Sequence, residues 1–261
     1  MTAVRPPAVA GTFYPSDTTE LEAQVAGYLA AVEPEGPAPK ALIAPHAGYI
    51  YSGPVAASAY ARLAAGRETI ERVVLLGPAH RVPFRGIAAS SATAFATPMG
   101  SVPVDVEAVQ SIRGLPRLVV LDEAHRLEHS LEVQLPFLQR VMGDFSVVPL
   151  VVGDATAEEV AEVLEALWGG PDTAIVISSD LSHYHDYETA RRLDAATSRA
   201  IEELRPDDIG PDQACGRLPI KGLLRVARAH GLKATTVDLR NSGDTAGPRG
   251  DVVGYGAWVF A

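Results

Sequence analysis

The chain has 261 residues, 47% of them hydrophobic and 21% charged, and it carries a formal net charge of −10 at pH 7. At this length a chain buries roughly 75% of the surface that it exposes when unfolded, so one large core is stable without disulfides or structural metals. A single domain over residues 1–261 is therefore expected. The negative charge repels phosphate backbones, and no basic stripe interleaves with aromatic residues. Nucleic acid is therefore excluded as the expected partner.

The cysteine content and the first residues predict the compartment. The one cysteine, Cys215, cannot form a disulfide within the chain. The N-terminal sequence MTAVRPPAVAGTFYP lacks the basic start and the apolar centre of a secretory signal. A cytoplasmic location is therefore expected. No membrane contact is expected either, because no apolar run approaches the roughly 20 residues of a membrane-spanning helix.

Hydrophobic periodicity and turn residues predict alternating helices and strands. In the first half of the chain we expect a helix over 17–32, a strand over 41–45, a helix that begins near Pro54, a strand over 72–76, a helix over 104–112, a strand over 117–121 and a helix over 130–141. In the second half we expect a strand over 145–151, a helix over 157–167, a strand over 174–178, helices over 188–204 and around 220–227, and strands over 234–239 and 252–260. Residues 87–98 give no clear pattern. The alternation favours an α/β fold with a central mixed sheet flanked by helices.

Three of the expected strands end in residues that can bind a metal or move a proton. The sequence ALIAPH ends in His46, VVLLGPAH ends in His80, and AIVISSDLSH contains Asp180 and His183. Ligands of open α/β sheets lie at the carboxyl ends of the strands, so these side chains are predicted to face one crevice. Two imidazoles on neighbouring strands can share iron, copper or zinc. The alternative is that each histidine only makes structural hydrogen bonds.

Cys215 is the natural third ligand, and its alternative is a small buried apolar residue. Pro219 marks the start of a helix, whose free amides and positive dipole end would lower the pKa of a nearby thiol. A thiolate is the form that binds metal or attacks a substrate. Both roles stay open for this residue.

Two further segments are dense in groups that transfer protons. In the run SSDLSHYH, Asp180 beside His183 suits general acid or base catalysis, although an Asp or Ser helix cap is the alternative. In HRLEH, His125 and His129 are four residues apart, but the glutamate adjoins the second histidine, so this is not the HExxH zinc motif. Glu128, His129 and Glu132 either line the crevice at the head of a helix or lie on a solvated surface.

Seven blocks spread over the whole chain carry a resemblance to a known family. They are RPPAVAGTFYP, APHAGYIYSGPVAA, LLGPAH, EHSLEVQLPFLQ, SSDLSHY, CGRLPIKGLL, and SGDTAG with VVGYGA. On these blocks the chain is identified as a member of the Memo family, whose prokaryotic members are called AmmeMemoRadiSam system protein B. That naming implies two partners, an AMMECR-type protein and a radical SAM enzyme.

The family is similar to the class III extradiol dioxygenases, and this resemblance implies the same fold and a related metal site. Those enzymes hold non-haem iron(II) with two histidines and a glutamate. His46 and His80 match the two histidine ligands, and Cys215 falls where the dioxygenases supply the carboxylate. A thiolate is softer and more easily oxidised than a carboxylate. Iron(II) is therefore the expected metal, copper or zinc compete with it, and catechol cleavage is not implied.

The same resemblance suggests catalytic residues. His183 resembles the acid–base histidine of the dioxygenases, Asp180 lies beside it, and His129 resembles another histidine of the pocket. The first hypothesis is thus a metal-dependent redox enzyme, an oxidoreductase acting on a small organic molecule or a peptide. The second is a metal-free hydrolase with Cys215 as nucleophile. The third is a non-catalytic module whose vestigial active site binds peptides or a partner protein.

Overall fold

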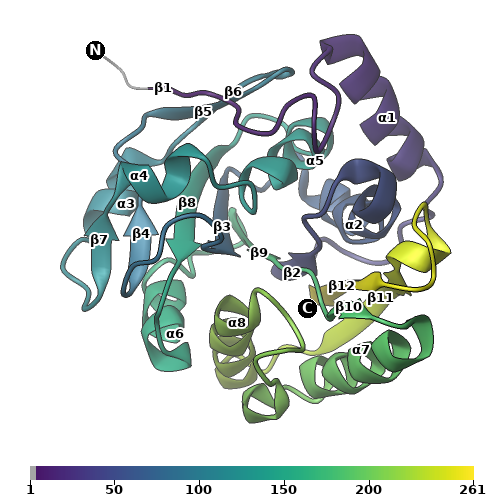
Figure 1. Cartoon of the computed structure of the whole chain (residues 1–261). Helices are drawn as coiled ribbons and strands as arrows, with labels where there is room; N and C mark the ends of the chain where they lie inside the picture. The colour runs from purple at the N-terminus through teal and green to yellow at the C-terminus, as the bar shows by residue number, and fades with distance from the viewer. Residues whose placement is uncertain (1–3) are drawn as a thin grey trace.

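A mixed sheet of nine strands forms the centre of the computed structural model, which describes residues 4–261 (Figure 1). Its strands are β2 (Ala41–Ala44), β3 (Arg72–Pro78), β4 (Ile87–Ala89), β7 (Leu118–Val120), β8 (Ser146–Val152), β9 (Thr173–Ser178), β10 (His183–His185), β11 (Ala234–Asn241) and β12 (Val252–Phe260). They are ordered β10-β12-β2-β9-β3-β8-β4-β7, with β11 also paired to β12. The α/β fold with a central mixed sheet is confirmed.

The middle of the sheet is parallel and apolar. Strands β2, β9, β3 and β8 pair in parallel, whereas β12 is antiparallel to β2, and β4 is antiparallel to β8. Every residue of β2 and β9 is buried, as their unbroken apolar sequences require when helices cover both faces of a sheet. This burial fixes the positions of the strand ends from which the polar residues emerge.

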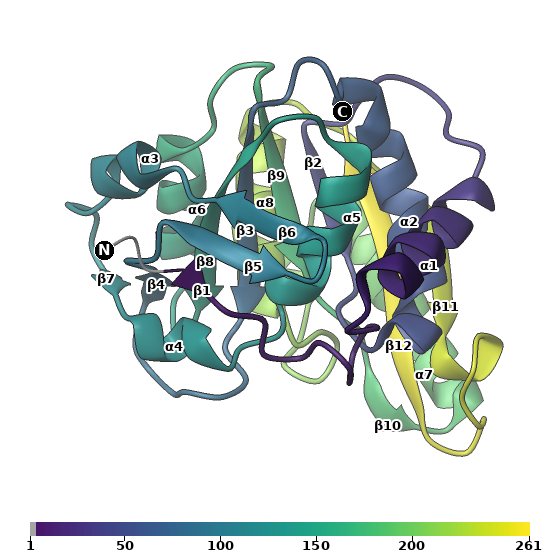
Figure 2. The ribbon, with the colours of Figure 1, turned by 90° about the horizontal axis from the view of Figure 1, so that it is seen from above.

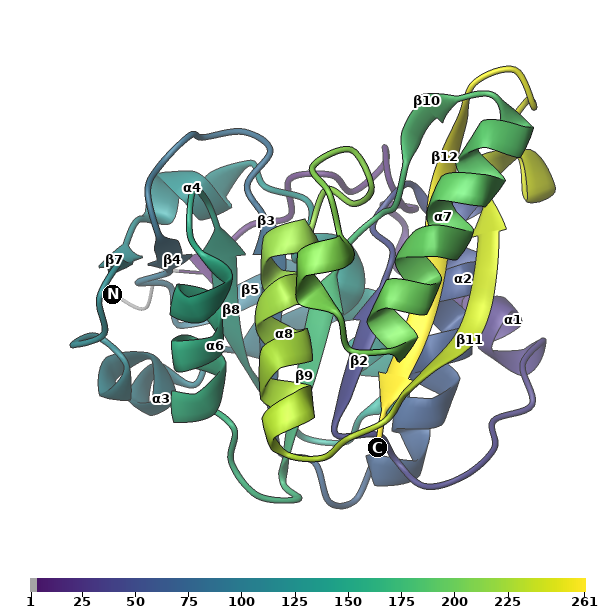
Figure 3. The same cartoon turned by 90° about the horizontal axis from the view of Figure 1, so that it is seen from below.

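Helices cover both faces of the sheet. They are α1 (Thr18–Ala30), α2 (Tyr49–Leu63), α3 (Val106–Ser111), α4 (Asp122–Arg126), α5 (Leu135–Val141), α6 (Ala157–Ala166), α7 (Tyr187–Glu202) and α8 (Arg217–Ala229). Figure 2 shows α1, α2 and α5 on one face, beside a small sheet of β1 (Val4–Arg5), β5 (Ala94–Thr97) and β6 (Gly100–Pro103). Figure 3 shows α6, α8 and α7 side by side over the other face. No helix within residues 4–261 is long and apolar enough to cross a bilayer.

Local sequence signals explain some element boundaries but not others. The carboxylate of Asp17 accepts a hydrogen bond from the Glu20 amide and so caps α1, as its spacing predicts. The predicted start of the second helix near Pro54 is wrong, because α2 begins at Tyr49 and contains the proline. Residues 87–98, which give no clear pattern in the sequence, contain all of β4 and β5.

Candidate metal centre

Three neighbouring parallel strands deliver the candidate residues to one edge of the sheet. His46, His80 and Asp180 each follow the last residue of their strand by two positions, after β2, β3 and β9 respectively. Because β9 pairs in parallel with both β2 and β3, the three strands end together. Cys215 comes from the loop that leads into α8, where Gly216 is the N-cap.

The structure brings the three expected ligands together. One ligand atom from each of His46, His80 and Cys215 can be chosen so that all three lie within 4.8 Å of one another. The Cys215 Sγ lies 3.3 Å from the His46 Nε2, and the two imidazole rings meet edge to face with their centroids 5.1 Å apart. Metal–nitrogen and metal–sulfur bonds of about 2.0–2.3 Å need only small side-chain movements from this arrangement.

The hydrogen bonds of His46 fix its tautomer. The hydroxyl of Ser178 donates its single hydrogen to the Ser130 carbonyl at 2.5 Å, and it also accepts from the Gln134 side-chain amide at 2.8 Å. The His46 Nδ1, 2.8 Å from the same hydroxyl oxygen, must therefore be the donor in that contact. The Nε2 that faces Cys215 keeps its lone pair. Burial also holds the pKa of His46 well below its usual value, with His80 and His129 adding to the effect, so the ring is neutral.

A carboxylate does the same for His80. Glu128 accepts hydrogen bonds from the His80 amide at 2.6 Å and from the His80 Nδ1 at 2.9 Å, and also from the amides of His129 and Ser130. Burial alone would raise the pKa of Glu128, but these donors outweigh it and hold the pKa at about 2. Since the carboxylate is ionised, the Nδ1 carries the hydrogen and Nε2 is free. Metal-binding histidines usually donate their second N–H in this way.

The thiol of Cys215 differs from its sequence-based expectation. Burial, followed by the charge of Asp180, raises the pKa of Cys215 to about 12. The prediction that the helix start would lower it is wrong: α8 begins at Arg217, two residues after the cysteine, but desolvation and the Asp180 charge outweigh the hydrogen bonds that neighbouring groups offer to the sulfur. The Asp180 amide, 3.3 Å from Sγ, offers a hydrogen bond to the sulfur. The thiol is therefore protonated at neutral pH unless a cation lies next to it.

The three expected catalytic residues lie around this cluster. Asp180 accepts a hydrogen bond from the His46 amide at 2.7 Å, and its burial raises its pKa. It thus supports the His46 backbone. It does not orient His183, because the carbonyl of Leu181 accepts the hydrogen bond from the His183 Nδ1 at 2.8 Å. That bond leaves the His183 Nε2 free. His129 stacks on His80 with ring centroids 4.6 Å apart, and its Nδ1 lies 3.3 Å from Glu128.

A crevice of about 590 Å³ adjoins the cluster. The residues that line it include two of the proposed ligands, His80 and Cys215, together with His183 and Tyr184. Tyr184 is 77% exposed and has a φ of 59°, a left-handed conformation at the bulge in β10. A small organic molecule or a peptide side chain fits this volume.

Some of the supporting residues have only weak signals in the sequence. Glu128 is 2% exposed, so the solvated reading of HRLEH is wrong for this residue. Gln134 and the Leu181 carbonyl were not expected at all. Pro136, two residues after Gln134 at the start of α5, is the sequence signal near this glutamine, whereas a backbone carbonyl leaves none.

Comparisons with known proteins agree with this architecture. The family model described as Memo-like protein matches residues 5–259. A MEMO1 family protein of Aquifex aeolicus is 40% identical over 98% of this chain and 99% of its own length. One of Aeropyrum pernix is 38% identical over 97% and 98%. The crystal structure of an uncharacterized protein of Escherichia coli K12 matches with a TM-score of 0.55 and 15% identity over 84% of this chain and 98% of its own, which shows the fold alone. The chain belongs to the Memo family.

Proposed function

We propose that this Memo-family chain is a metal-dependent redox enzyme that holds one iron(II) ion with His46, His80 and Cys215. The observation that carries the proposal is the convergence of the three ligand atoms, with both histidines held in the tautomer that leaves Nε2 free. The substrate is a small organic molecule or a peptide that enters the adjacent crevice. Dioxygenase-like chemistry is one form of this activity.

The chemistry of the donor set fits a cation. Two neutral imidazoles and one thiolate supply three ligands and leave other coordination positions open, and iron, copper and zinc all accept these donor types. The high pKa of Cys215 in the protein alone is also consistent with a metal site, because a bound cation stabilises the thiolate that burial disfavours. Bound iron(II) supplies Lewis acidity and one-electron redox chemistry.

The chain itself supplies proton transfer and positioning. His183 lines the crevice, and its free Nε2 can accept a proton from a substrate or return it. Asp180 holds the His46 backbone, and Glu128 holds His80, so both ligands are fixed before any ion arrives. Pre-positioned groups of this kind lower the cost of binding and of reaction.

Metal stoichiometry tests the proposal. His46→Ala and His80→Ala are purified without affinity-column metal, loaded anaerobically with iron(II), and measured for bound iron. We expect about one ion per chain in the parent protein and nearly none in either variant. His185→Ala is the matched control, because this histidine lines the crevice but lies outside the ligand cluster. Unchanged iron in both ligand variants would exclude the site, and anomalous scattering at the iron, copper and zinc edges identifies the metal.

A metal-free cysteine nucleophile is the second candidate, because the 3.3 Å contact between Cys215 Sγ and His46 Nε2 is the geometry of a cysteine–histidine pair. The raised pKa of Cys215 disfavours it. Fast labelling by iodoacetamide near neutral pH, in chelator-treated protein, would support this candidate. Slow labelling would count against it.

The proposed partners and compartment rest on the family naming and the sequence alone. We propose that the chain works beside an AMMECR-type protein and a radical SAM enzyme in the cytoplasm. Co-purification of either companion with the tagged chain tests this partnership. Turnover by the isolated chain would instead separate the activity from the partnership and exclude a purely non-catalytic binding module.

A further inference from the structure

A turn near the N-terminus contacts the loop that carries His46. Residues 9–14 form this turn, which has backbone hydrogen bonds of its own. The Phe13 carbonyl accepts a hydrogen bond at 2.8 Å from the amide of Tyr49, the third residue after His46. The rings of Tyr14 and Tyr49 are also in contact, with their centroids 5.6 Å apart. The turn is thus attached to one side of the metal centre.

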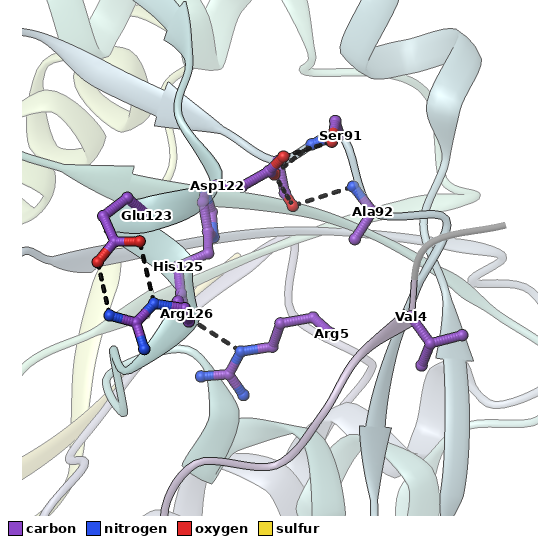
Figure 4. A pocket seen from close by; sticks show the side chains of 9 residues that line it. Val4, Arg5, Ser91, Ala92, Asp122, Glu123, His125 and Arg126 are labelled. Atoms are coloured by element: carbon purple, nitrogen blue, oxygen red, sulfur yellow. Dashed lines mark hydrogen bonds and ion pairs between the residues drawn. The ribbon is translucent and has the colours of Figure 1, made fainter. Parts of the chain in front are cut away.

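Arg5 attaches the same N-terminal segment to the other side of the centre. Its guanidinium donates to the His125 carbonyl at 3.0 Å (Figure 4) and to the Glu128 carbonyl at 2.6 Å. Glu128 is the carboxylate that holds His80. Because Arg5 is buried, these charge-assisted hydrogen bonds form away from water and are strong. The N-terminal segment therefore contacts the supports of both ligand histidines.

One buried carboxylate latches this segment. Glu132 is fully buried, so the solvated surface that the sequence left open for it is wrong. One of its oxygens accepts from Arg5 and, at 2.7 Å, from the Ala8 amide. The other accepts from the Val9 amide at 3.0 Å and from the Tyr14 hydroxyl at 2.5 Å. All four donors belong to the N-terminal segment, so its position depends on this single side chain.

The imidazole of His129 is held by ring packing. Its Nδ1 lies 3.3 Å from Glu128 but has no hydrogen-bond partner within residues 4–261, whereas both ligand histidines have an acceptor for Nδ1. The His129 ring instead contacts Phe13 with centroids 4.7 Å apart and His80 with centroids 4.6 Å apart. Phe13 is therefore the contact that the N-terminal segment makes with this imidazole.

We propose that Phe13 is a positioning residue of the metal centre: it fixes the imidazole of His129 against His80, and Glu132 holds Phe13 in place. The catalytic role of His129 rests on the proposed function, but the packing of its ring does not. A group that is already oriented before a substrate arrives lowers the cost of the reaction. Supporting residues supply this orientation when they restrict the rotamers of the groups that they contact.

The order of the His129 ring tests the role of Phe13. Carbon-13 relaxation of labelled histidine rings is measured in the metal-free full chain, so the result does not depend on whether iron is bound. We expect the order parameter of this ring to fall from about 0.85 to below about 0.6 in Phe13→Ala. Phe13→Tyr keeps the aromatic ring and should retain the parent value. Unchanged order in Phe13→Ala would overturn the proposal.

Phe145→Ala is the matched control for a general loosening of the core. Phe145 is partly buried against the core, as Phe13 is, but it precedes β8 at the opposite edge of the sheet from the metal centre. Both alanine variants should lose stability, whereas only Phe13→Ala should release the His129 ring. A fall of the same size in Phe145→Ala would contradict the assignment.

Hydrogen exchange at the Ala8 and Val9 amides tests the latch. Glu132→Gln replaces one accepting oxygen with an N–H group, so we expect both amides to exchange at least about tenfold faster, which corresponds to about 1.4 kcal/mol, and the His129 ring to lose order. If this variant does not fold, Glu132→Asp, which keeps the charge on a shorter side chain, carries the test with the same expected direction. Parent-like exchange, or fast exchange with an ordered His129 ring, would refute the latch.

Discussion

Two buried carboxylates support two loops of the candidate site, and their pKa values are shifted in opposite directions. Glu128 holds the loop of His80, and Asp194 accepts a hydrogen bond from the amide of Ser182, the residue before His183. Their exposed fractions are nearly equal, at 2% and 3%. Yet the pKa of Glu128 is lowered to about 2, whereas burial raises the pKa of Asp194 to about 6.

The number of donors explains the difference. Glu128 accepts hydrogen bonds from three backbone amides and one imidazole, which together offset its desolvation. Ser182 is the main donor to Asp194, and the backbone of Gly254 packs so closely against this carboxylate that a Cβ there would lie 2.1 Å from it. Burial alone therefore does not set the pKa; the number of donors around the carboxylate decides the direction of the shift. The His80 side of the site has a fixed charge, and the His183 side is sensitive to pH.

Replacing Glu128 should have the largest effect. Glu128→Gln puts an amide N–H where an oxygen now accepts, so we expect the free energy of unfolding at pH 7 to fall by about 3–5 kcal/mol and iron affinity to fall about 10–100-fold. Urea unfolding and iron titration measure these changes. Glu165→Gln is the matched control, because Glu165 contacts His230 over the same 2.9 Å on the surface, where such pairs contribute about 0–1 kcal/mol.

The pH dependence of that effect has a defined sign. The pKa of Glu128 is depressed in the folded state, so its stabilisation is present above the ordinary value of 4.5 and is lost as the pH falls towards 2. The parent and the Gln variant should therefore converge in stability over this range. Parallel curves would show that the ionised carboxylate is not the source of the effect.

Asp194 should behave in the opposite sense. Its raised pKa means that its stabilising effect is complete below the ordinary value of 3.8 and is lost as the pH rises through about 6. Asp194→Asn keeps the acceptor for Ser182 without the charge. We expect it to be more stable than the parent at pH 7, by up to about 3 kcal/mol, and to lose this advantage near pH 4. Urea unfolding between pH 4 and 7 measures it, with Asp212→Asn, at an exposed position, as the control.

These two carboxylates also show what the sequence could predict. The meeting of His46 with His80 follows from their places after strands, because parallel strands end at one edge of a sheet, although the prediction that their strands are neighbours is wrong, since β9 lies between β2 and β3. The role of Glu128 does not, since four donors from three different residues reach it only when the chain is folded. The direction of the Cys215 pKa shift was wrong for the same reason: the sequence shows the following helix but not the burial.

Ser178 tests whether a ligand histidine needs a charged partner at all. This neutral hydroxyl accepts from His46 Nδ1, in the place that Glu128 takes at His80. Ser178→Ala removes the acceptor, so the tautomer of His46 is no longer fixed and iron affinity should fall up to about 10-fold, at the lower end of the range for supporting residues. The expected order is thus Glu128→Gln before Ser178→Ala. An equal or larger loss in Ser178→Ala would break the contrast between the two histidines.

The smallest expected effect concerns the backbone on the His183 side. Tyr184 is the bulged residue of β10 with a φ of 59°, a position where glycine is the usual residue. Its ring is 77% exposed, so little burial is lost when it is removed. Glycine would relieve about 1–2 kcal/mol of left-handed strain and cost about 0.5–1 kcal/mol in chain entropy. Tyr184→Gly should therefore raise the free energy of unfolding by the difference, about 0.5–1 kcal/mol, whereas Tyr184→Ala, which keeps the Cβ, should not. If the glycine and alanine variants are equally stable, the backbone at Tyr184 stores no strain. The raised pKa of Asp194 would then be the one difference between this side of the site and the His80 side.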